Sequence, residues 1–162
     1  MSKLLEPFEV MGLRFKNRIV HEPTTFNMSD PQGYATRRLA AAYGSIAKGG
    51  YAATVVGATC VRRDGLINER MLGLYDEDYV IEFRDTVSEI KNNDSLAGIQ
   101  LFYGGLIPGL GATVPLKPGK GWIPGTVSWG PSNKYFIGNP QCDVIPTKEY
   151  EDIVESYAQA AR

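Results

Sequence analysis

A short stretch near the N-terminus, residues 17–25, places a proline and two hydroxyl side chains directly after an apolar strand. Pro23 lacks an N–H group, so we expect the strand, from about Arg18 to Glu22, to stop there. Thr24 and Thr25 would then present small donor and acceptor groups just beyond the strand. In parallel α/β proteins, binding and catalytic groups lie at these strand ends. This stretch alone favours the simpler interpretation, which is a short strand that runs into a polar turn.

Three other positions carry groups that could contact a ligand. Gln100 lies in an apolar strand, where its amide must bond either to neighbouring backbone or to a ligand. Gly57 and Ala58 are small residues at a strand end, which allow either tight helix packing or the close approach of a flat ligand. His21 is the only histidine, so no His-based metal cluster can form within this chain. We favour a histidine that packs near the core.

The hydrophobic pattern predicts a hairpin followed by alternating strands and helices. Alternating residues on both sides of Met11-Gly12 predict hairpin strands over 8–10 and 13–15. The later pattern predicts, in order, strands over 18–22, 51–58 and 96–101, with a helix over 37–48 capped by Thr36 and a helix from 76 or 78 to 91 between them. Such alternation indicates a parallel sheet with crossover helices. Because the strand over 51–58 is apolar on both faces, we expect a sheet covered on both sides.

Each predicted helix has an apolar face that should point inward. The inward residues are expected to be Leu39, Ala42, Tyr43 and Ile46 in the first helix, Val80, Phe83, Val87 and Ile90 in the second, and Ile153, Val154, Tyr157 and Ala161 in a final helix capped by Thr147. Residues 102–146 hold most of the prolines and predict a long loop. Both tryptophans lie in that loop, which favours a packed loop over a disordered one.

Composition excludes several classes of function. The chain has 162 residues, is 43% hydrophobic and 22% charged, and carries a net charge of −1, which is typical of a globular domain. No basic stripe is present, so we expect no nucleic-acid partner. No apolar run could span a bilayer, and the N-terminus lacks a signal-peptide core, so we expect no membrane partner and a cytoplasmic location. Cys60 and Cys142 are far apart, and we interpret both as reduced thiols.

Three strands and three helices are too few to close a barrel of alternating parallel strands and helices. Such a barrel needs eight strand–helix units and typically about 250 residues. The final helix has no strand after it in this sequence. We therefore expect residues 1–162 to form the front part of a larger domain.

Several short motifs together are specific to one family. They are Lys16–Val20 with Pro23–Thr25, Ala47–Gly50, Val56–Thr59, Gly98–Leu101, Gly130–Ser132 and Tyr157–Arg162. In order and spacing, over essentially the whole chain, they resemble the old yellow enzyme family of NADH:flavin oxidoreductases and ene-reductases. Within that family the chain is similar to the anaerobic 2-enoate and dienoyl-CoA reductase branch.

The resemblance implies an α/β fold that is a partial (β/α)8 TIM barrel. Residues 1–162 would be the N-terminal portion of a single FMN-binding domain, with the first three βα units, the N-terminal hairpin and the long loop after the third strand. FMN would lie at the C-terminal mouth of the barrel, and NAD(P)H would be the reductant. The flavin contacts that the resemblance implies are Pro23, Thr24, Thr25, Ala58 and Gln100. We expect Tyr103 and the long loop to contact the substrate.

Each implied contact would lie at a particular part of the flavin ring. Pro23, Thr24 and Thr25 would lie along the ring, with Thr25 near the O4/N5 edge. Ala58 would touch the polar edge through its backbone, and Gln100 would bond the pyrimidine side. Amides and hydroxyls at these places stabilise charge on the reduced flavin.

Two departures from the family pattern matter. Where the family commonly has His-Ala-Gly-Arg, this chain has Tyr103–Leu106, so the arginine is lost. The family's substrate-activating His/His or His/Asn pair and its flavin-phosphate site come from later strands, so we assign no catalytic residue here. The iron–sulfur cysteines of the anaerobic branch also come later. A 4Fe-4S cluster is therefore expected only if the chain continues, and Cys60 and Cys142 are not its ligands.

Three hypotheses on function follow. The first is an FMN-dependent oxidoreductase that passes hydride from NAD(P)H through FMN to the C=C bond of an activated alkene or enone. The second is a non-catalytic half-barrel, a fragment or subunit that associates with itself or with a complementary barrel half. The third, a flavin-free lyase or aldolase, is disfavoured because no lysine lies at the C-terminal end of a predicted strand.

Overall fold

A computed structural model describes residues 2–105, 129–132 and 143–162. The elements of these residues are η1 (Lys3–Leu5), β1 (Phe8–Val10), β2 (Leu13–Phe15), β3 (Val20–Thr25), α1 (Arg37–Lys48), β4 (Ala53–Cys60), η2 (Arg63–Gly65), β5 (Leu72–Gly73), α2 (Glu77–Asn92), β6 (Leu96–Phe102), β7 (Trp129–Gly130), β8 (Asp143–Val144) and α3 (Thr147–Ala160). The predicted alternation of strands and helices is confirmed.

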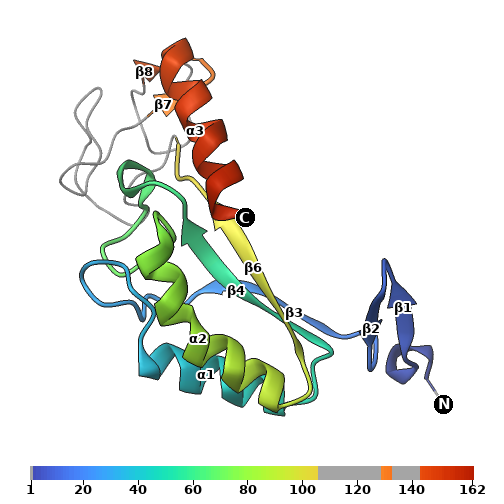
Figure 1. Ribbon diagram of the computed structural model, residues 1–162. Coiled ribbons are helices and arrows are strands. Elements are labelled where there is room, and N and C mark those ends of the chain that lie inside the picture. The colour runs from blue at the N-terminus through green and yellow to red at the C-terminus, as the bar shows by residue number, and fades with distance from the viewer. Residues whose placement is uncertain (1, 106–128, 133–142) are drawn as a thin grey trace.

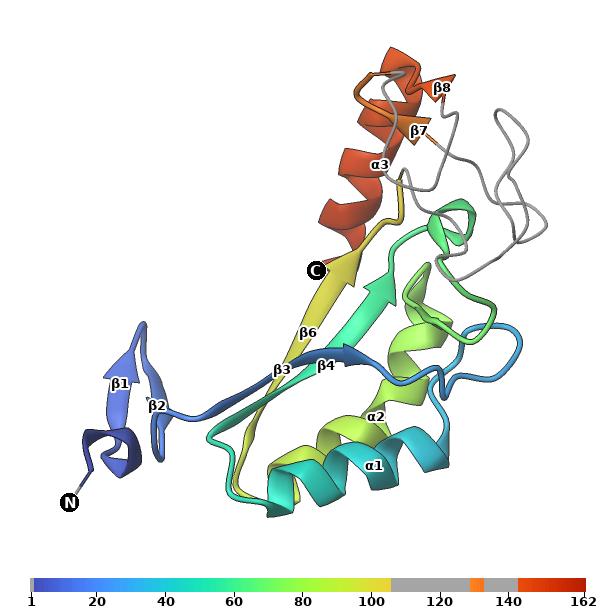
Figure 2. The same cartoon turned by 180° about the vertical axis from the view of Figure 1, so that it is seen from behind.

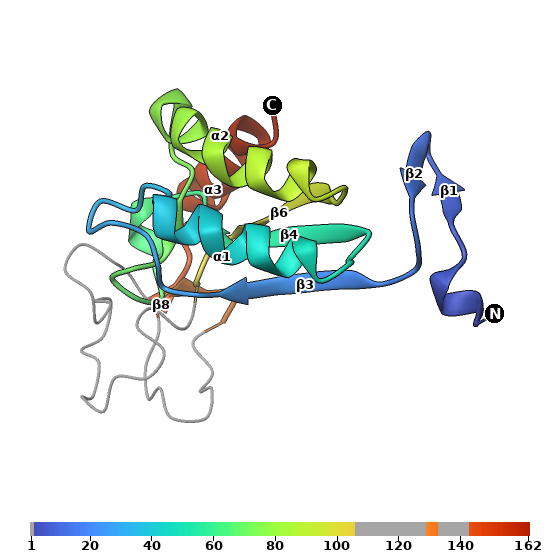
Figure 3. The same ribbon diagram turned by 90° about the horizontal axis from the view of Figure 1, so that it is seen from below.

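The main sheet is parallel. β4 pairs with β3 on one side and with β6 on the other, and the two-residue strand β5 adds to the end of β4. Helices α1 and α2 lie side by side on one face of this sheet, as the view from below shows (Figure 3). The sequence predicted cover on both faces, and among the described residues α1 and α2 cover only one.

The N-terminal hairpin forms as predicted. β1 and β2 pair antiparallel, with Phe8 opposite Phe15 and their rings stacked at 4.6 Å. Met11 and Gly12 both have positive φ, at 51° and 76°, which is the geometry of a tight two-residue hairpin turn. The hairpin lies apart from the main sheet (Figures 1 and 2).

Capping residues set where the first two helices begin. The Thr36 hydroxyl accepts a hydrogen bond from the Leu39 N–H at 3.2 Å, and the Asp76 carboxylate accepts one from the Asp78 N–H at 3.0 Å. Both side chains satisfy N–H groups that a helix N-terminus leaves unpaired. The helix predicted over 37–48 is confirmed, and the second helix begins one residue after its cap at Asp76.

The core lies between α1, α2 and the covered face of the sheet. Its most completely buried side chains include Leu39 and Tyr43 of α1, Val56 of β4 and Ile90 of α2. The inward face predicted for α2 is partly wrong, because Val80 is 55% exposed. The buried residues of α2 are Tyr79, Phe83, Thr86 and Ile90. Tyr79 is the residue that packs inward, where its ring stacks on Tyr34 at 4.1 Å.

Two other sequence predictions need correction. Pro23 does not end the first core strand but lies inside β3, which spans Val20–Thr25 and not the predicted 18–22. Proline is tolerated there because the register of the β3–β4 pair shifts between His21 and Thr24, at a point where no ladder N–H is needed. Thr147 does not cap α3, since the cap residue is Pro146, whose extended backbone precedes the first turn.

Helix α3 differs from the other two helices in having no buried residue. Of its predicted inward face, Ile153 and Tyr157 are partly buried, whereas Val154 and Ala161 are exposed. Most of the loop predicted over 102–146, including Trp122 and Cys142, lies outside the described residues. Its described parts hold β7 and β8, which pair parallel. Among the described residues, no helix is both long and apolar enough to cross a membrane.

Candidate functional site

The candidate site lies where the regular ladder of the sheet breaks. The β3–β4 register shifts between His21 and Thr24, and the β4–β6 register shifts between Val56 and Thr59. Both irregularities fall toward the carboxyl ends of the strands, which is the end where parallel α/β folds place their ligands. We call this region, residues 21–24 of β3 and 56–59 of β4, the break. Some backbone groups in the break have no ladder partner and need another hydrogen-bond partner.

Gly57 brings the predicted contacts Pro23 and Gln100 together from two different strands. A Cβ atom at residue 57 would lie 2.8 Å from Cβ of Pro23 and 3.0 Å from Cβ of Gln100. Only glycine therefore lets the three strands approach this closely. The Gly57–Ala58 peptide bond is cis. Val56 and Leu101, the neighbours of Gly57 and Gln100, pack in or against the core under α1 and α2, so Gly57 and Gln100 face the opposite side of the sheet.

Two hydroxyls satisfy the backbone N–H groups at the break. The Tyr43 hydroxyl, carried by α1, accepts a hydrogen bond from the Gly57 N–H at 3.0 Å. The Thr25 hydroxyl accepts one from the Ala58 N–H at 3.2 Å. Both bonds run from side chains of other elements to consecutive residues of β4. They hold the backbone of Gly57 and Ala58 in one arrangement against β3.

Tyr43 also binds the neighbouring strand. Its hydroxyl lies 3.2 Å from the Thr24 carbonyl oxygen and 3.4 Å from the Gly57 carbonyl oxygen, either of which can accept its proton. The residue is completely buried, and its ring packs against His21 and Phe26. Burial raises the pKa of the Tyr43 hydroxyl, while the hydrogen bond with Gly57 opposes the shift. The phenol therefore stays protonated and can donate.

The remaining predicted contacts differ in what they offer. The side chain of Gln100 is exposed and makes no hydrogen bond within the part of the chain that the structure describes, so its amide is available. The Thr24 hydroxyl lies 3.5 Å from the Glu22 carbonyl and is exposed, while the Thr24 carbonyl faces Tyr43. Thr25 uses an acceptor lone pair for Ala58, which leaves its hydroxyl proton free to donate.

Tyr103, the predicted substrate contact, packs against the loop after β4. Its ring lies so close to Gly65 that a Cβ there would overlap it. Its hydroxyl is buried without a hydrogen-bond partner among the described residues, and burial raises its pKa. The guanidinium of Arg62 lies 6.0 Å from the ring centroid. Tyr103 is thus placed beside an arginine rather than beside Gly57.

Arg62 links the loop after β4 to helix α3. It forms a bidentate ion pair with Asp64, at 3.1 and 2.6 Å, and reaches Glu149 of α3 at 3.0 Å. Burial opposes the charge of Arg62, but its hydrogen bonds to Asp64 and Glu149 outweigh this effect and raise its pKa.

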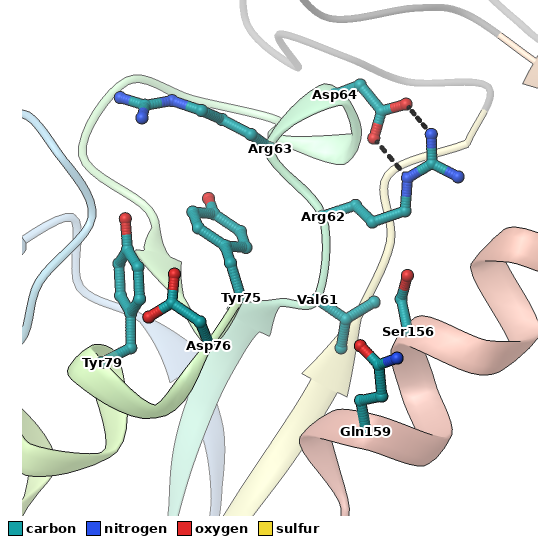
Figure 4. Close-up of a pocket in the computed structure, with 9 residues that line it drawn as sticks. All are labelled: Val61, Arg62, Arg63, Asp64, Tyr75, Asp76, Tyr79, Ser156 and Gln159. Atoms are coloured by element: carbon teal, nitrogen blue, oxygen red, sulfur yellow. Dashed lines mark hydrogen bonds and ion pairs between the residues drawn. The ribbon is translucent and has the colours of Figure 1, made fainter.

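A pocket of about 570 Å³ lies beside this ion pair (Figure 4). It is lined by Val61, Arg62, Arg63, Asp64, Tyr75, Asp76, Tyr79, Ser156 and Gln159. None of the predicted flavin contacts lines it, so the pocket is separate from the break in the ladder. The Tyr75 hydroxyl is buried without a partner among the described residues, and burial raises its pKa.

Cysteine and metal chemistry find no support among the described residues. Cys60 is fully buried, and burial raises the pKa of its thiol to about 12. The described ranges contain no group of three or more His, Cys, Asp or Glu side chains that could hold a metal ion. Cys142 lies outside these ranges.

The comparisons with known proteins decide the family. Residues 3–162 match the model of the NADH:flavin oxidoreductase / NADH oxidase family. The chain belongs to this family. It is 33% identical over 105 residues to an NADPH dehydrogenase of Bacillus cytotoxicus, and 34% identical over 113 residues to one of Listeria welshimeri. These matches cover 64% and 67% of this chain but only 30% and 33% of the relatives, so the chain spans about a third of their length.

Solved structures show the same fold. A 2-naphthoyl-CoA reductase superposes with a TM-score of 0.82 over 98% of this chain and 25% of its own, at 19% identity. Morphinone reductase in complex with tetrahydroNAD gives 0.80 over 99% and 46%, at 17% identity. An old yellow enzyme from Pichia sp. AKU4542 gives 0.80 over 99% and 42%, at 20% identity. The chain therefore has the fold of the N-terminal part of an old yellow enzyme TIM barrel.

Sequence reasoning missed the role of Tyr43. The helical pattern assigned it to an apolar face, which is correct, but the pattern says nothing of its hydroxyl. A phenol on an otherwise apolar helix face needs a hydrogen-bond partner once it is buried. That requirement could have marked Tyr43 as a link between α1 and the sheet, although not which strands it joins.

Proposed function

We propose that this chain forms the flavin-ring side of an FMN-dependent NAD(P)H oxidoreductase of the ene-reductase type, acting on an activated alkene or enone. The observation that carries the proposal is the gathering of Pro23, Gln100 and the Thr25–Ala58 pair around Gly57. These residues lie on three strands, and the sequence resemblance had assigned Pro23, Thr24, Thr25, Ala58 and Gln100 to one ligand.

The residues present fit a flat ring with a polar edge. Because Gly57 has no side chain, Pro23 and Gln100 come together over its backbone, and Pro23 offers an apolar surface there. Gln100 supplies an unused amide, and Thr25 supplies a hydroxyl proton that Ala58 does not occupy. Such a set suits an aromatic ring whose polar atoms need both donors and an acceptor.

The chemistry divides between the cofactor and the chain. Bound FMN would supply the redox chemistry that connects NAD(P)H with the alkene. The chain's own residues would orient the ring and hold its polar edge. The Thr25 hydroxyl would donate at the O4/N5 edge, and the Gln100 amide would hold the pyrimidine side. Because its oxygen already accepts from the Ala58 N–H, the Thr25 hydroxyl is a stronger donor.

The decisive experiment is FMN titration of the chain combined with the remaining part of the barrel, and of the same combination carrying Thr25→Ala. We expect the variant to bind FMN more weakly and to shift the reduction potential of the bound flavin, by about 1.5–3 kcal/mol for a hydrogen bond to a charged form. Thr147→Ala, an exposed threonine at the start of α3, is the matched control and should change neither quantity. An unchanged potential and affinity in Thr25→Ala would remove Thr25 from the site.

A second candidate function is a half-barrel that works only with a complementary chain or a second copy. Two observations favour it: α3 has no buried residue, and within the described residues β3 and β6 each pair with β4 alone. Unpaired strand edges and open apolar faces promote association.

Size-exclusion chromatography with light scattering tests this candidate. We expect the isolated chain to be an oligomer with little FMN and no enone reductase activity, and the remaining part of the barrel to restore both when added. A monomeric chain that carries one FMN and reduces an activated alkene would contradict this candidate and support the first. A cytoplasmic location stays a prediction of the sequence.

A further inference from the structure

We propose that Tyr43 is a positioning residue, whose buried hydroxyl sets the arrangement of Thr25 and Ala58 toward the flavin edge. The inference rests on the proposed function. Tyr43 belongs to α1, on the covered face of the sheet, so it would act through the backbone and not by touching the cofactor.

The hydrogen bonds at the break form two consecutive links. The Gly57 N–H bonds the Tyr43 hydroxyl, and the next N–H along the chain, that of Ala58, bonds the Thr25 hydroxyl. Through its own proton, Tyr43 also reaches the carbonyl of Thr24, the residue before Thr25. The Tyr43 hydroxyl therefore contacts the backbone of Thr24 and of Gly57, which are the residues immediately before Thr25 and Ala58.

The broken ladder explains why a side chain is needed here. In a regular parallel pair, the strands would satisfy these groups themselves. The register shift between His21 and Thr24 removes that arrangement. A buried N–H that loses its acceptor is costly, so the Tyr43 hydroxyl fixes where Gly57 can lie.

The opposite end of β4 supplies a matched control. There the Thr54 hydroxyl bonds the Ser95 hydroxyl at 3.0 Å, and both residues are buried. This bond also joins β4 to another segment, the residue before β6, through buried hydroxyls, but it lies where the β4–β6 register is regular. Ser95→Ala thus removes a buried hydrogen bond of similar kind without touching the break.

The test measures two quantities in Tyr43→Phe and in Ser95→Ala. Amide hydrogen exchange of the FMN-free chain should show the Ala58 N–H exchanging at least about tenfold faster in Tyr43→Phe and unchanged in Ser95→Ala. FMN titration with the remaining part of the barrel added should show affinity lowered about tenfold by Tyr43→Phe and less than about twofold by Ser95→Ala. In a Thr25→Ala background, Tyr43→Phe should have little further effect on FMN affinity, because it acts through Thr25.

Each alternative outcome has a meaning. Equal effects of both variants on FMN affinity would assign Tyr43 a general structural role and overturn the inference. A Tyr43→Phe chain that fails to fold while Ser95→Ala folds would overturn it as well. An unchanged exchange rate of the Ala58 N–H in Tyr43→Phe would show that Tyr43 does not hold Ala58 in place, and would overturn the inference. A wild-type chain that binds no FMN even with the remaining part of the barrel added would contradict the proposed function, and the exchange result would still decide whether Tyr43 positions the Thr25–Ala58 pair.

Discussion

The two faces of the main sheet differ in composition and in exposure. On the face under α1 and α2, Val56 packs with Leu39, Tyr43 and Ile90, and all four side chains are almost completely buried. On the opposite face, Pro23 and Gln100 meet over Gly57 and remain partly or largely exposed. The same strands supply both faces, because successive side chains of a strand point to opposite sides.

If the open face holds the flavin as proposed, the two faces separate stability from ligand binding. The covered face gains its free energy from apolar area removed from water, which depends on volume and not on particular polar groups. The open face gathers a small number of polar groups and one position without a side chain. Apart from Tyr43, whose hydroxyl reaches the backbone of Gly57 and Thr24, substitutions on the first face should therefore change the free energy of unfolding, and substitutions on the second should change ligand binding.

The largest expected effect is on the covered face. Leu39→Ala should lower the free energy of unfolding by about 2–5 kcal/mol, because it leaves a cavity between α1, α2 and β4. Urea denaturation measures this effect. Val154→Ala, on the exposed side of α3, is the control and should change stability by less than about 0.5 kcal/mol. If Leu39→Ala and Val154→Ala lower the free energy of unfolding by similar amounts, Val154 of α3 is as well buried in solution as Leu39 of α1.

A smaller effect is expected at the point where the two faces meet. Gly57→Ala places a methyl group 2.8 Å from Cβ of Pro23 and 3.0 Å from Cβ of Gln100, so these strands must move apart. Overpacking of this kind costs about 1–3 kcal/mol. The variant should lose both stability and FMN affinity. Gly98→Ala is the control, since its nearest contact is an ordinary one at 3.4 Å from Val55. Normal FMN binding by Gly57→Ala would separate this position from the site.

On the open face alone, Gln100→Leu should weaken FMN binding by about 1–3 kcal/mol, because the ring keeps a polar edge that has lost its partner. Its effect on unfolding should be below about 0.5 kcal/mol, since the side chain is exposed. FMN titration and urea denaturation of the same preparation measure the two quantities. If the variant unfolds more easily while the folded fraction binds FMN normally, Gln100 is structural.

The smallest effect at neutral pH concerns the buried thiol of Cys60. Burial raises its pKa from 9.0 to about 12, so the native state keeps a proton that the unfolded chain releases in this range. The contribution to stability is therefore complete below pH 9 and is lost as the pH rises toward 12. Cys60→Ala should flatten this part of the pH profile. If stability falls equally between pH 9 and pH 12 in the wild-type chain and in Cys60→Ala, the loss belongs to the buried tyrosines instead.

Local sequence patterns predicted most of the secondary structure. The helix over 37–48 and the hairpin around Met11-Gly12 were correct, because a capping threonine and a positive-φ turn are local features. The two-residue strand β5 was missed, since Leu72–Gly73 has no pattern of its own and is a strand only through pairing with Thr59 and Cys60.

Helix faces and strand ends were predicted less well. Val80 was expected inward from its spacing, but Tyr79 occupies the inward position, where the ring of Tyr34 lies. Pro23 was expected to end a strand, yet β3 continues through it, since an irregular register removes the need for its N–H. Both differences depend on neighbours that are distant in sequence.

The sequence by itself determined the alternation of elements, the family resemblance and the residues proposed to contact FMN, because these depend on residue types and their spacing. Only the tertiary structure decided that Pro23 and Gln100 meet over Gly57, and that Thr25 accepts from Ala58. It also decided that the Tyr43 hydroxyl fills the gap in the ladder. Such contacts are set by strand register and by the absence of one Cβ atom, and a single chain's pattern specifies neither until the strands have paired.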